Sequence, residues 1–106
     1  MNPTDTPVIR DNPALSRIEA SVGTETGYAE YRLGSSTLTF THTRVPESLR
    51  GKGIGTHLIE AGLAMARSRN LQVIPICPFF RAYLRTHPET QALLGAEGRR
   101  LLAEST

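Results

Sequence analysis

The sequence predicts an α+β fold, in which helices pack on a mixed, mostly antiparallel sheet. Three observations support this prediction. Between residues 16 and 45, polar and apolar residues alternate in short runs separated by turns, as antiparallel strands do. Residues 56–70 instead repeat their apolar side chains at helical spacing. An apolar run follows this helix, and a second helical segment comes after it. The last alternating strand, the first helix and the apolar run therefore form a strand–helix–strand unit, which implies one parallel pair of strands.

The strand region divides into three expected strands, at residues 16–22, 28–33 and 37–45. The connections GTETG and GSS contain the glycine and small polar residues that favour tight turns. In the third strand, threonines alternate with a second set of residues, which we expect to share one face: Leu38, Phe40, His42 and Arg44. Pro46 cannot donate a hydrogen bond to a sheet, so this strand should end there.

The second half of the domain begins with the helix expected over residues 56–70. Asn70 is a suitable residue to end it, because asparagine tolerates the left-handed conformation found after many helices. Residues 71–77 are continuously apolar and rich in β-branched side chains, which is typical of a buried strand. Pro75 within this run indicates a bulge or an edge position. A helix should start at Pro78, and a further short helix is expected over residues 89–94.

The two ends of the chain give weaker patterns. Residues 1–14 are polar and contain three prolines, so we expect a flexible N-terminal tail. Residues 96–106 are expected to form a C-terminal tail. A single domain over residues 15–95 remains.

Composition excludes several classes of function. Hydrophobic residues make up 39% and charged residues 21%, and the formal net charge is only +2. The basic residues are scattered, so we expect no nucleic-acid partner. The single cysteine, Cys77, excludes an internal disulfide and a paired-cysteine zinc site, and we expect no bound metal. With no signal peptide or membrane-spanning run in the sequence, we expect a cytoplasmic protein without a membrane partner, either a monomer or a weak dimer.

The segment RGKGIGT, residues 50–56, is the most informative stretch. Glycines placed just before a helix let the backbone approach an anion, and the free N–H groups of the first helical turn attract it. Arg50 and Lys52 add positive charge. The spacing fits neither the mononucleotide P-loop nor the dinucleotide GxGxxG pattern. The physical expectation is therefore a cradle for a diphosphate of another kind.

This glycine segment fits the pattern Arg/Gln-x-x-Gly-x-Gly/Ala, which binds coenzyme A. Residues 42–89 as a whole resemble the small, single-domain GCN5-related N-acetyltransferase (GNAT)-like proteins. The shared signatures are HT-x-VP at residues 42–46, RGKGIG at residues 50–55, and CPF followed by Tyr83 and HPE at residues 87–89. The resemblance implies a minimal GNAT-like fold, with acetyl-CoA or coenzyme A as its cofactor.

The resemblance also assigns cofactor-binding positions. In the family, the backbone of the glycine loop holds the diphosphate, which here implies Arg50, Gly51, Lys52, Gly53, Ile54, Gly55 and Thr56. The end of the preceding strand pairs with the pantetheine amides, which implies Thr43, Arg44 and Val45. Three aromatic residues could line the far wall of the groove, with core packing as the alternative: Phe79, Phe80 and Tyr83.

Two residues are candidates for proton transfer. His42 lies near the end of one strand and Cys77 ends the next, so both can face one cleft if the strands are parallel neighbours. Histidine can act as a base near neutral pH, and the thiol could protonate the leaving thiolate or take the acetyl group itself. Direct attack of the acceptor on acetyl-CoA is the preferred mechanism. The simpler interpretations are a surface histidine and a core cysteine; His87 is expected only to cap its helix.

The function that follows is an enzyme, an N-acetyltransferase that moves an acetyl group from acetyl-CoA to an amine. The short connections leave no room for the helices that enclose the acceptor in longer family members. We therefore expect an open acceptor site, suited to a lysine or N-terminus on a protein or to a polyamine. The alternatives are a non-catalytic sensor or partner module that binds CoA or acetyl-CoA, and an adaptor that shares only the fold.

Overall fold

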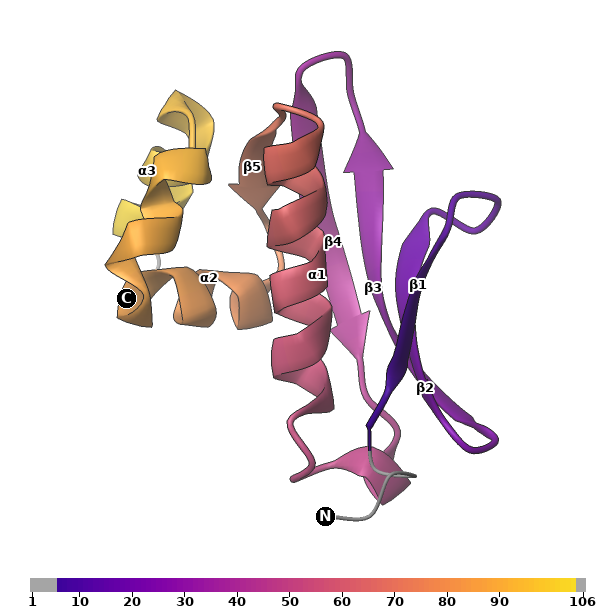
Figure 1. Ribbon diagram of the computed structural model, residues 1–106. Helices are drawn as coiled ribbons and strands as arrows, with labels where there is room; N and C mark the ends of the chain where they lie inside the picture. The colour runs from indigo at the N-terminus through magenta and orange to yellow at the C-terminus, as the bar shows by residue number, and fades with distance from the viewer. Residues whose placement is uncertain (1–5, 105–106) are drawn as a thin grey trace.

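The computed structural model describes residues 6–104, which form one five-stranded sheet and its helices (Figure 1). The elements in chain order are β1 (Val8–Asn12), β2 (Arg17–Val22), β3 (Glu25–Leu33), β4 (Thr37–Arg44), the 3-10 helix η2 (Glu47–Leu49), α1 (Ile54–Ser68), β5 (Gln72–Pro75), α2 (Pro78–Thr86), the 3-10 helix η3 (Pro88–Leu93) and α3 (Ala96–Glu104). The strands lie side by side in sequence order; only the β4–β5 pair is parallel. The predicted α+β class is confirmed.

Helix α1 covers one face of the sheet and forms the core with it. Its buried side chains repeat at helical spacing, and the strands present small, branched and aromatic residues to them: Leu58, Ile59, Leu63 and Ala66 on the helix; Ile18, Ala20, Ala29, Leu38 and Phe40 on the strands. Each large apolar side chain buried here contributes about 1.5–3 kcal/mol. Gly62 brings the helix close to the sheet, because a Cβ at this position would lie 2.7 Å from the Phe40 ring.

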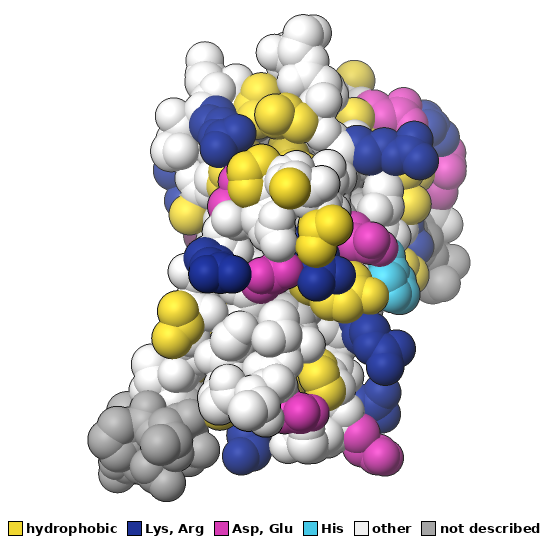
Figure 2. All heavy atoms as spheres, turned by 90° about the vertical axis from the view of Figure 1, so that its right-hand side faces the viewer, with side chains coloured by type: hydrophobic (Ala, Val, Ile, Leu, Met, Phe, Trp, Pro, Cys, Tyr) yellow, Lys and Arg dark blue, Asp and Glu magenta, His cyan; other side chains and the backbone are white. Residues whose placement is uncertain are grey.

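The opposite face of the sheet is polar. The helices lie to the left of β1, β2 and β3 in Figure 1, and Figure 2, which looks from the right, shows charged side chains of both signs interspersed. On β2 and β3, cross-strand pairs of this face join Arg17 to Glu30 and Glu19 to Tyr28. No helix in residues 6–104 is long and apolar enough to cross a membrane.

The N-terminal tail prediction is wrong for residues 8–12. These residues form β1, which pairs antiparallel with β2 along its whole length, from Val8 opposite Ser21 to Asn12 opposite Arg17. The pairing satisfies the backbone of a polar segment whose composition alone predicts no strand. Residues 1–5 lie outside the described part of the chain.

The C-terminal tail prediction is wrong for residues 96–104, which form α3 packed beside β5. Ion pairs from Arg100 to Glu97 and Glu104 run along one side of this helix. Gly98 permits the contact with the sheet, since a Cβ there would lie 2.6 Å from the Val73 carbonyl oxygen. Residues 105 and 106 are outside the described range.

The C-terminus of α1 confirms the expected cap. Asn70 has φ 57°, in the left-handed region, and the Leu71 N–H donates to the Ala66 carbonyl over 2.8 Å. The Asn70 N–H donates to the carbonyl of Arg67. These two bonds are those of a Schellman motif, which satisfies the last carbonyls of the helix and turns the chain into β5.

Candidate functional site

The site begins where β4 and β5 separate. The two strands pair in parallel only from Thr37 opposite Gln72 to Phe40 opposite Pro75. The last bond between them runs from the Cys77 N–H to the Phe40 carbonyl, over 2.9 Å. Pro75 has no N–H to donate and the chain then enters α2, while β4 continues to Arg44. The end of β4 is therefore left without a neighbouring strand on its β5 side.

A groove of about 570 Å³ occupies the opening between the separated strands. Its walls come from the end of β4, from the loop that enters α1, and from the start of α2. The lining residues are His42, Thr43, Val45, Leu49, Arg50, Gly51, Gly53, Ile54, Gly55, Thr56, Cys77, Pro78 and Phe79. The predicted parallel arrangement of the two strands is confirmed, and it brings His42 and Cys77 to the same groove.

A β-bulge in β4 changes the orientation of His42. Phe40 pairs with Tyr31 and His42 with Glu30, so Thr41 is an extra residue on β4. The expected alternation through Arg44 is therefore wrong beyond Phe40. Leu38 and Phe40 are buried, whereas His42 and Arg44 are exposed. Bulges commonly re-aim side chains beside functional sites, and this one moves the imidazole out of the core.

Cys77 is buried in the wall of the groove, with only 4% of its surface exposed. Its Sγ lies 3.3 Å from the hydroxyl oxygen of Thr43, at hydrogen-bond distance. The thiol therefore has a polar neighbour on the facing strand. Burial and this contact together limit the access of the thiol to solvent and to reagents.

The three glycines around the start of α1 serve two different purposes. Gly51 and Gly53 have φ of 81° and 76°, a left-handed conformation that strains any residue with a Cβ. Gly55 lies within the helix and faces Phe79, where a Cβ would lie 2.2 Å from a ring carbon. The first two glycines shape the turn, and the third allows α1 and α2 to approach each other beside the groove.

Two helix N-termini meet at the groove. Helix α1 begins after Gly53 and α2 after Cys77, and neither N-cap residue forms a side-chain hydrogen bond to its helix. The first N–H groups of a helix lack partners within it and carry a partial positive charge. Both ends therefore favour an anionic group in the groove, and the exposed Arg50 adds a full charge.

The remaining predicted cofactor residues lie elsewhere. Arg44 lines a hollow of about 400 Å³ that adjoins the groove at His42. Lys52 is exposed on the loop and does not line the groove. Phe80 is 0% exposed and stacks on Phe40 with ring centroids 4.1 Å apart, so it belongs to the core. Phe79 is the preceding residue of α2 and points to a different side of the helix, so it forms the wall of the groove instead.

Tyr83 does not line the groove either. Its hydroxyl donates to Glu60 on α1 over 3.2 Å, and its ring stacks on His87 at 3.8 Å. Burial, followed by the bond to Glu60, raises the pKa of Tyr83 above its ordinary value. His87 caps α2 as predicted, with Nδ1 2.9 Å from the Tyr83 carbonyl oxygen. This cluster joins α1 to α2 on the outside of the site.

Two lining residues, Leu49 and Pro78, were not among the predicted site residues. Leu49 comes from η2 and is buried beneath the loop. A single apolar residue between the end of a strand and a glycine loop is the only sequence signal for it. Pro78 was predicted as the first residue of its helix, but its place in the groove depends on how α2 packs against α1.

Comparisons with known proteins identify the family of the chain. The sequence model of the GCN5-related N-acetyl-transferase family matches residues 17–93, which span most of the chain from β2 to η3. Protein NATD1 of Xenopus tropicalis is 31% identical over 61 residues, 58% of this chain and 56% of that protein. Protein NATD1 of Homo sapiens is 31% identical over 61 residues, 58% of this chain and 54% of its own length. The matched segment thus spans about half the length of these curated relatives. The chain belongs to the GCN5-related N-acetyltransferase family.

Proposed function

We propose that this protein is an N-acetyltransferase that takes acetyl-CoA as donor and an amine as acceptor. One observation carries the proposal: the strands separate beside a helix that begins with left-handed glycines, and the groove formed there also holds a histidine and a cysteine. Each of these features alone has a structural explanation. Their meeting at one groove, in a chain of this family, favours acetyl transfer.

The donor binds along the groove in two parts. The diphosphate lies on the backbone from Arg50 to Thr56, where the uncapped N-terminus of α1 and the left-handed glycines support an anion. The pantetheine arm runs beside Thr43, Arg44 and Val45. The lack of a β5 partner beyond Phe40 supports this placement, because the free edge of β4 can accept an extended chain.

The reaction forms a C–N bond and breaks a C–S bond. The neutral amine of the acceptor attacks the thioester carbonyl carbon, and the imidazole of His42 takes the proton that the amine loses and then releases it to solvent. The departing CoA thiolate takes a proton from the Cys77 thiol or from solvent, and solvent then restores the thiol. The burial of Cys77 and its contact with Thr43 support direct transfer over an acetyl-cysteine intermediate.

The acceptor approaches from an open side. His42 is exposed and borders both the groove and the adjoining hollow, whose other residues include Arg44 and Glu47. Little surface is available here to enclose a small molecule. An amine that brings its own structure suits such a site, namely a lysine or N-terminus on a protein, or a polyamine.

Binding without catalysis is the second candidate. The burial of Cys77 favours it, since a thiol with 4% exposure that already contacts Thr43 also fits a purely structural role. In this case the groove holds CoA or acetyl-CoA as a sensor or a partner module. Turnover, and its dependence on His42 and Cys77, separates the two candidates.

The first experiment is a calorimetric titration of acetyl-CoA into the wild type, Gly53→Glu and Gly23→Glu. Both glycines have left-handed φ, 76° and 61°, and open space at the Cβ position, so the two substitutions impose similar strain. Of these two glycines, Gly53 lines the groove and Gly23 lies in the β2–β3 turn, away from it. We expect micromolar binding by the wild type and Gly23→Glu, and none by Gly53→Glu.

The same samples are then tested for thiol release with a panel of amines and lysine peptides. Release by the wild type that falls in His42→Gln and Cys77→Ala supports the enzyme. Binding without release on any acceptor supports the sensor. If the wild type does not bind acetyl-CoA, or if both glycine variants bind equally well, the proposed groove is wrong.

A further inference from the structure

We infer that Tyr28, held in place by Arg17 and Glu19, is a positioning residue that orients the imidazole of His42 for acetyl transfer. This inference rests on the proposed function, because it concerns the residue assigned as base. Tyr28 and Arg17 lie on the polar face of the sheet and do not line the groove. They act on the reaction only through His42.

The contact between Tyr28 and His42 crosses from β3 to β4. In the register of the two strands His42 lies opposite Glu30 and Tyr28 opposite Arg44, so the two rings are diagonal neighbours on one face. Their centroids are 6.4 Å apart and the rings are inclined by 61°. This edge-to-face arrangement is one that aromatic rings prefer.

Tyr28 is itself fixed from its other side. The guanidinium carbon of Arg17 lies 4.4 Å from the centre of the Tyr28 ring, a cation–π distance. The same side chain donates from Nε to Glu19 over 2.8 Å. One side chain of β2 thus joins the ring to a carboxylate.

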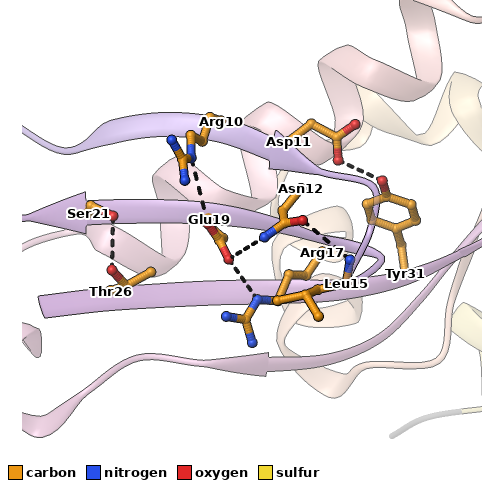
Figure 3. A network of polar contacts seen from close by, with 9 residues as sticks. All are labelled: Arg10, Asp11, Asn12, Leu15, Arg17, Glu19, Ser21, Thr26 and Tyr31. Atoms are coloured by element: carbon orange, nitrogen blue, oxygen red, sulfur yellow. Dashed lines mark hydrogen bonds and ion pairs between the residues drawn. The ribbon is translucent and has the colours of Figure 1, made fainter.

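Glu19 holds Arg17 in place, and Figure 3 shows this carboxylate in contact with Arg10, Asn12 and Arg17. It is only 7% exposed, yet it holds its charge through three partners on the sheet. Arg17 and Asn12 donate to it over 2.8 and 3.1 Å, and Arg10 lies 3.7 Å away. The bond from Arg17, followed by that from Asn12, lowers the pKa of Glu19, so the carboxylate stays ionised.

His42 needs such support because no other described side chain holds its ring. Within residues 6–104 its ring forms no hydrogen bond or ion pair, and its side chain is exposed. A general base must come within hydrogen-bond reach of the amine, and an exposed ring samples several rotamers. The Tyr28 ring restricts that choice on the side of β3.

The kinetic test compares four variants: Tyr28→Leu, Tyr28→Phe, Arg17→Met and, as matched control, Thr26→Val. The control removes a cross-strand contact on the same strand and face, the 2.9 Å bond between Thr26 and Ser21. We expect Tyr28→Leu to lower kcat about three- to tenfold, which is the change in rate that corresponds to the loss of one aromatic ring contact. Arg17→Met lowers it less, Tyr28→Phe and Thr26→Val leave it unchanged, and all four keep the wild-type affinity for acetyl-CoA.

A second test, by NMR spectroscopy, does not depend on turnover. The ring signals of His42, assigned by their absence in His42→Gln, are expected to shift and broaden in Tyr28→Leu and to stay in place in Tyr28→Phe. Unchanged His42 signals in Tyr28→Leu overturn the inference. A fall in kcat that Phe does not restore, or one matched by Thr26→Val, also overturns it.

His42→Gln separates this inference from the proposed function. If His42→Gln turns over acetyl-CoA like the wild type, the assigned base is wrong and Tyr28 has no reacting residue to position. If His42→Gln loses activity while Tyr28→Leu keeps its full kcat, only the positioning role of Tyr28 fails. Thermal denaturation of each variant excludes unfolding as the cause of any loss.

Discussion

The two halves of β4 differ more than their sequences suggest. Both are threonine-rich, but Thr37–Phe40 has a partner strand on each side, whereas Thr41–Arg44 pairs only with β3. The first half buries Leu38 and Phe40 beneath α1. The second half exposes His42 and borders the groove.

The difference between the halves shows how the site arises. Two local events at the same level of the sheet produce it: β5 ends at Pro75, and an extra residue in β4 shifts the register at Thr41. The end of β5 leaves one edge of β4 free, and the extra residue reverses the face of the sheet to which the following β4 side chains point. A stable sheet and an accessible site thus share one strand, and changes in each half should have separate effects.

The largest expected effect is on the paired half. Phe40→Ala should lower the free energy of unfolding by about 3–5 kcal/mol, because the ring is fully buried against Phe80 and Gly62. His42→Ala on the other half should change it by less than about 0.5 kcal/mol, while abolishing most turnover. Urea denaturation and thiol release measure the two quantities. Equal losses of stability would contradict the division of the strand.

Two glycines of α1 extend the comparison to the helix. Gly62→Ala should destabilise the protein by about 1–3 kcal/mol, since the new Cβ meets the buried Phe40 ring. In Gly55→Ala the nearest atoms to the new Cβ belong to the outer part of the Phe79 ring, and Phe79 is 46% exposed, so the ring can move aside into solvent. There the better helix propensity of alanine, about 1 kcal/mol, offsets the strain. The displaced ring should weaken acetyl-CoA binding in Gly55→Ala, and a stable, fully binding variant would show that Phe79 does not matter.

Tyr31 lies opposite Phe40 and ties the paired half to β1. Its hydroxyl donates to Asp11 over 2.6 Å; burial, followed by this bond, raises the pKa of Tyr31 to about 12. Tyr31→Phe should cost about 1–2 kcal/mol at neutral pH. The folded state favours the neutral phenol, so the Tyr31 contribution is complete below about pH 10 and falls as pH rises toward 12. Unfolding curves of the two proteins should therefore converge over this interval; a constant difference would show that ionisation of Tyr31 does not matter.

A smaller loss of stability than that of Tyr31→Phe is expected for a contact in the open half. Thr43→Val removes the hydroxyl that contacts Cys77 and keeps the shape of the side chain. We expect a loss of about 0.5–1 kcal/mol in the free energy of unfolding, because a single weak hydrogen bond is removed. Faster alkylation of Cys77 by iodoacetamide should accompany it. A loss as large as that of Phe40→Ala would place Thr43 in the core instead.

Much of the site followed from short-range chemistry in the sequence. Glycines at alternate positions before a helical repeat predicted the loop at residues 50–56, since few other residues adopt such a turn. Strand periodicities also placed His42 and Cys77 near the ends of two expected strands, but the parallel pairing that brings both to one groove was only a condition at that point. The aromatic residue that lines the groove was harder to predict, because Phe79 and Phe80 are adjacent in sequence and the packing of α2 decides which of them faces the groove.

By itself, the sequence determined the fold class, the order of most elements, the glycine loop and the Asn70 cap, because each depends on the conformational preferences of a few adjacent residues. Tertiary structure alone decided four further features. It made Val8–Asn12 a strand and Ala96–Glu104 a packed helix, it placed the bulge at Thr41, and it set the width of the groove. These depend on backbone pairing and side-chain packing between distant segments, which no local pattern encodes.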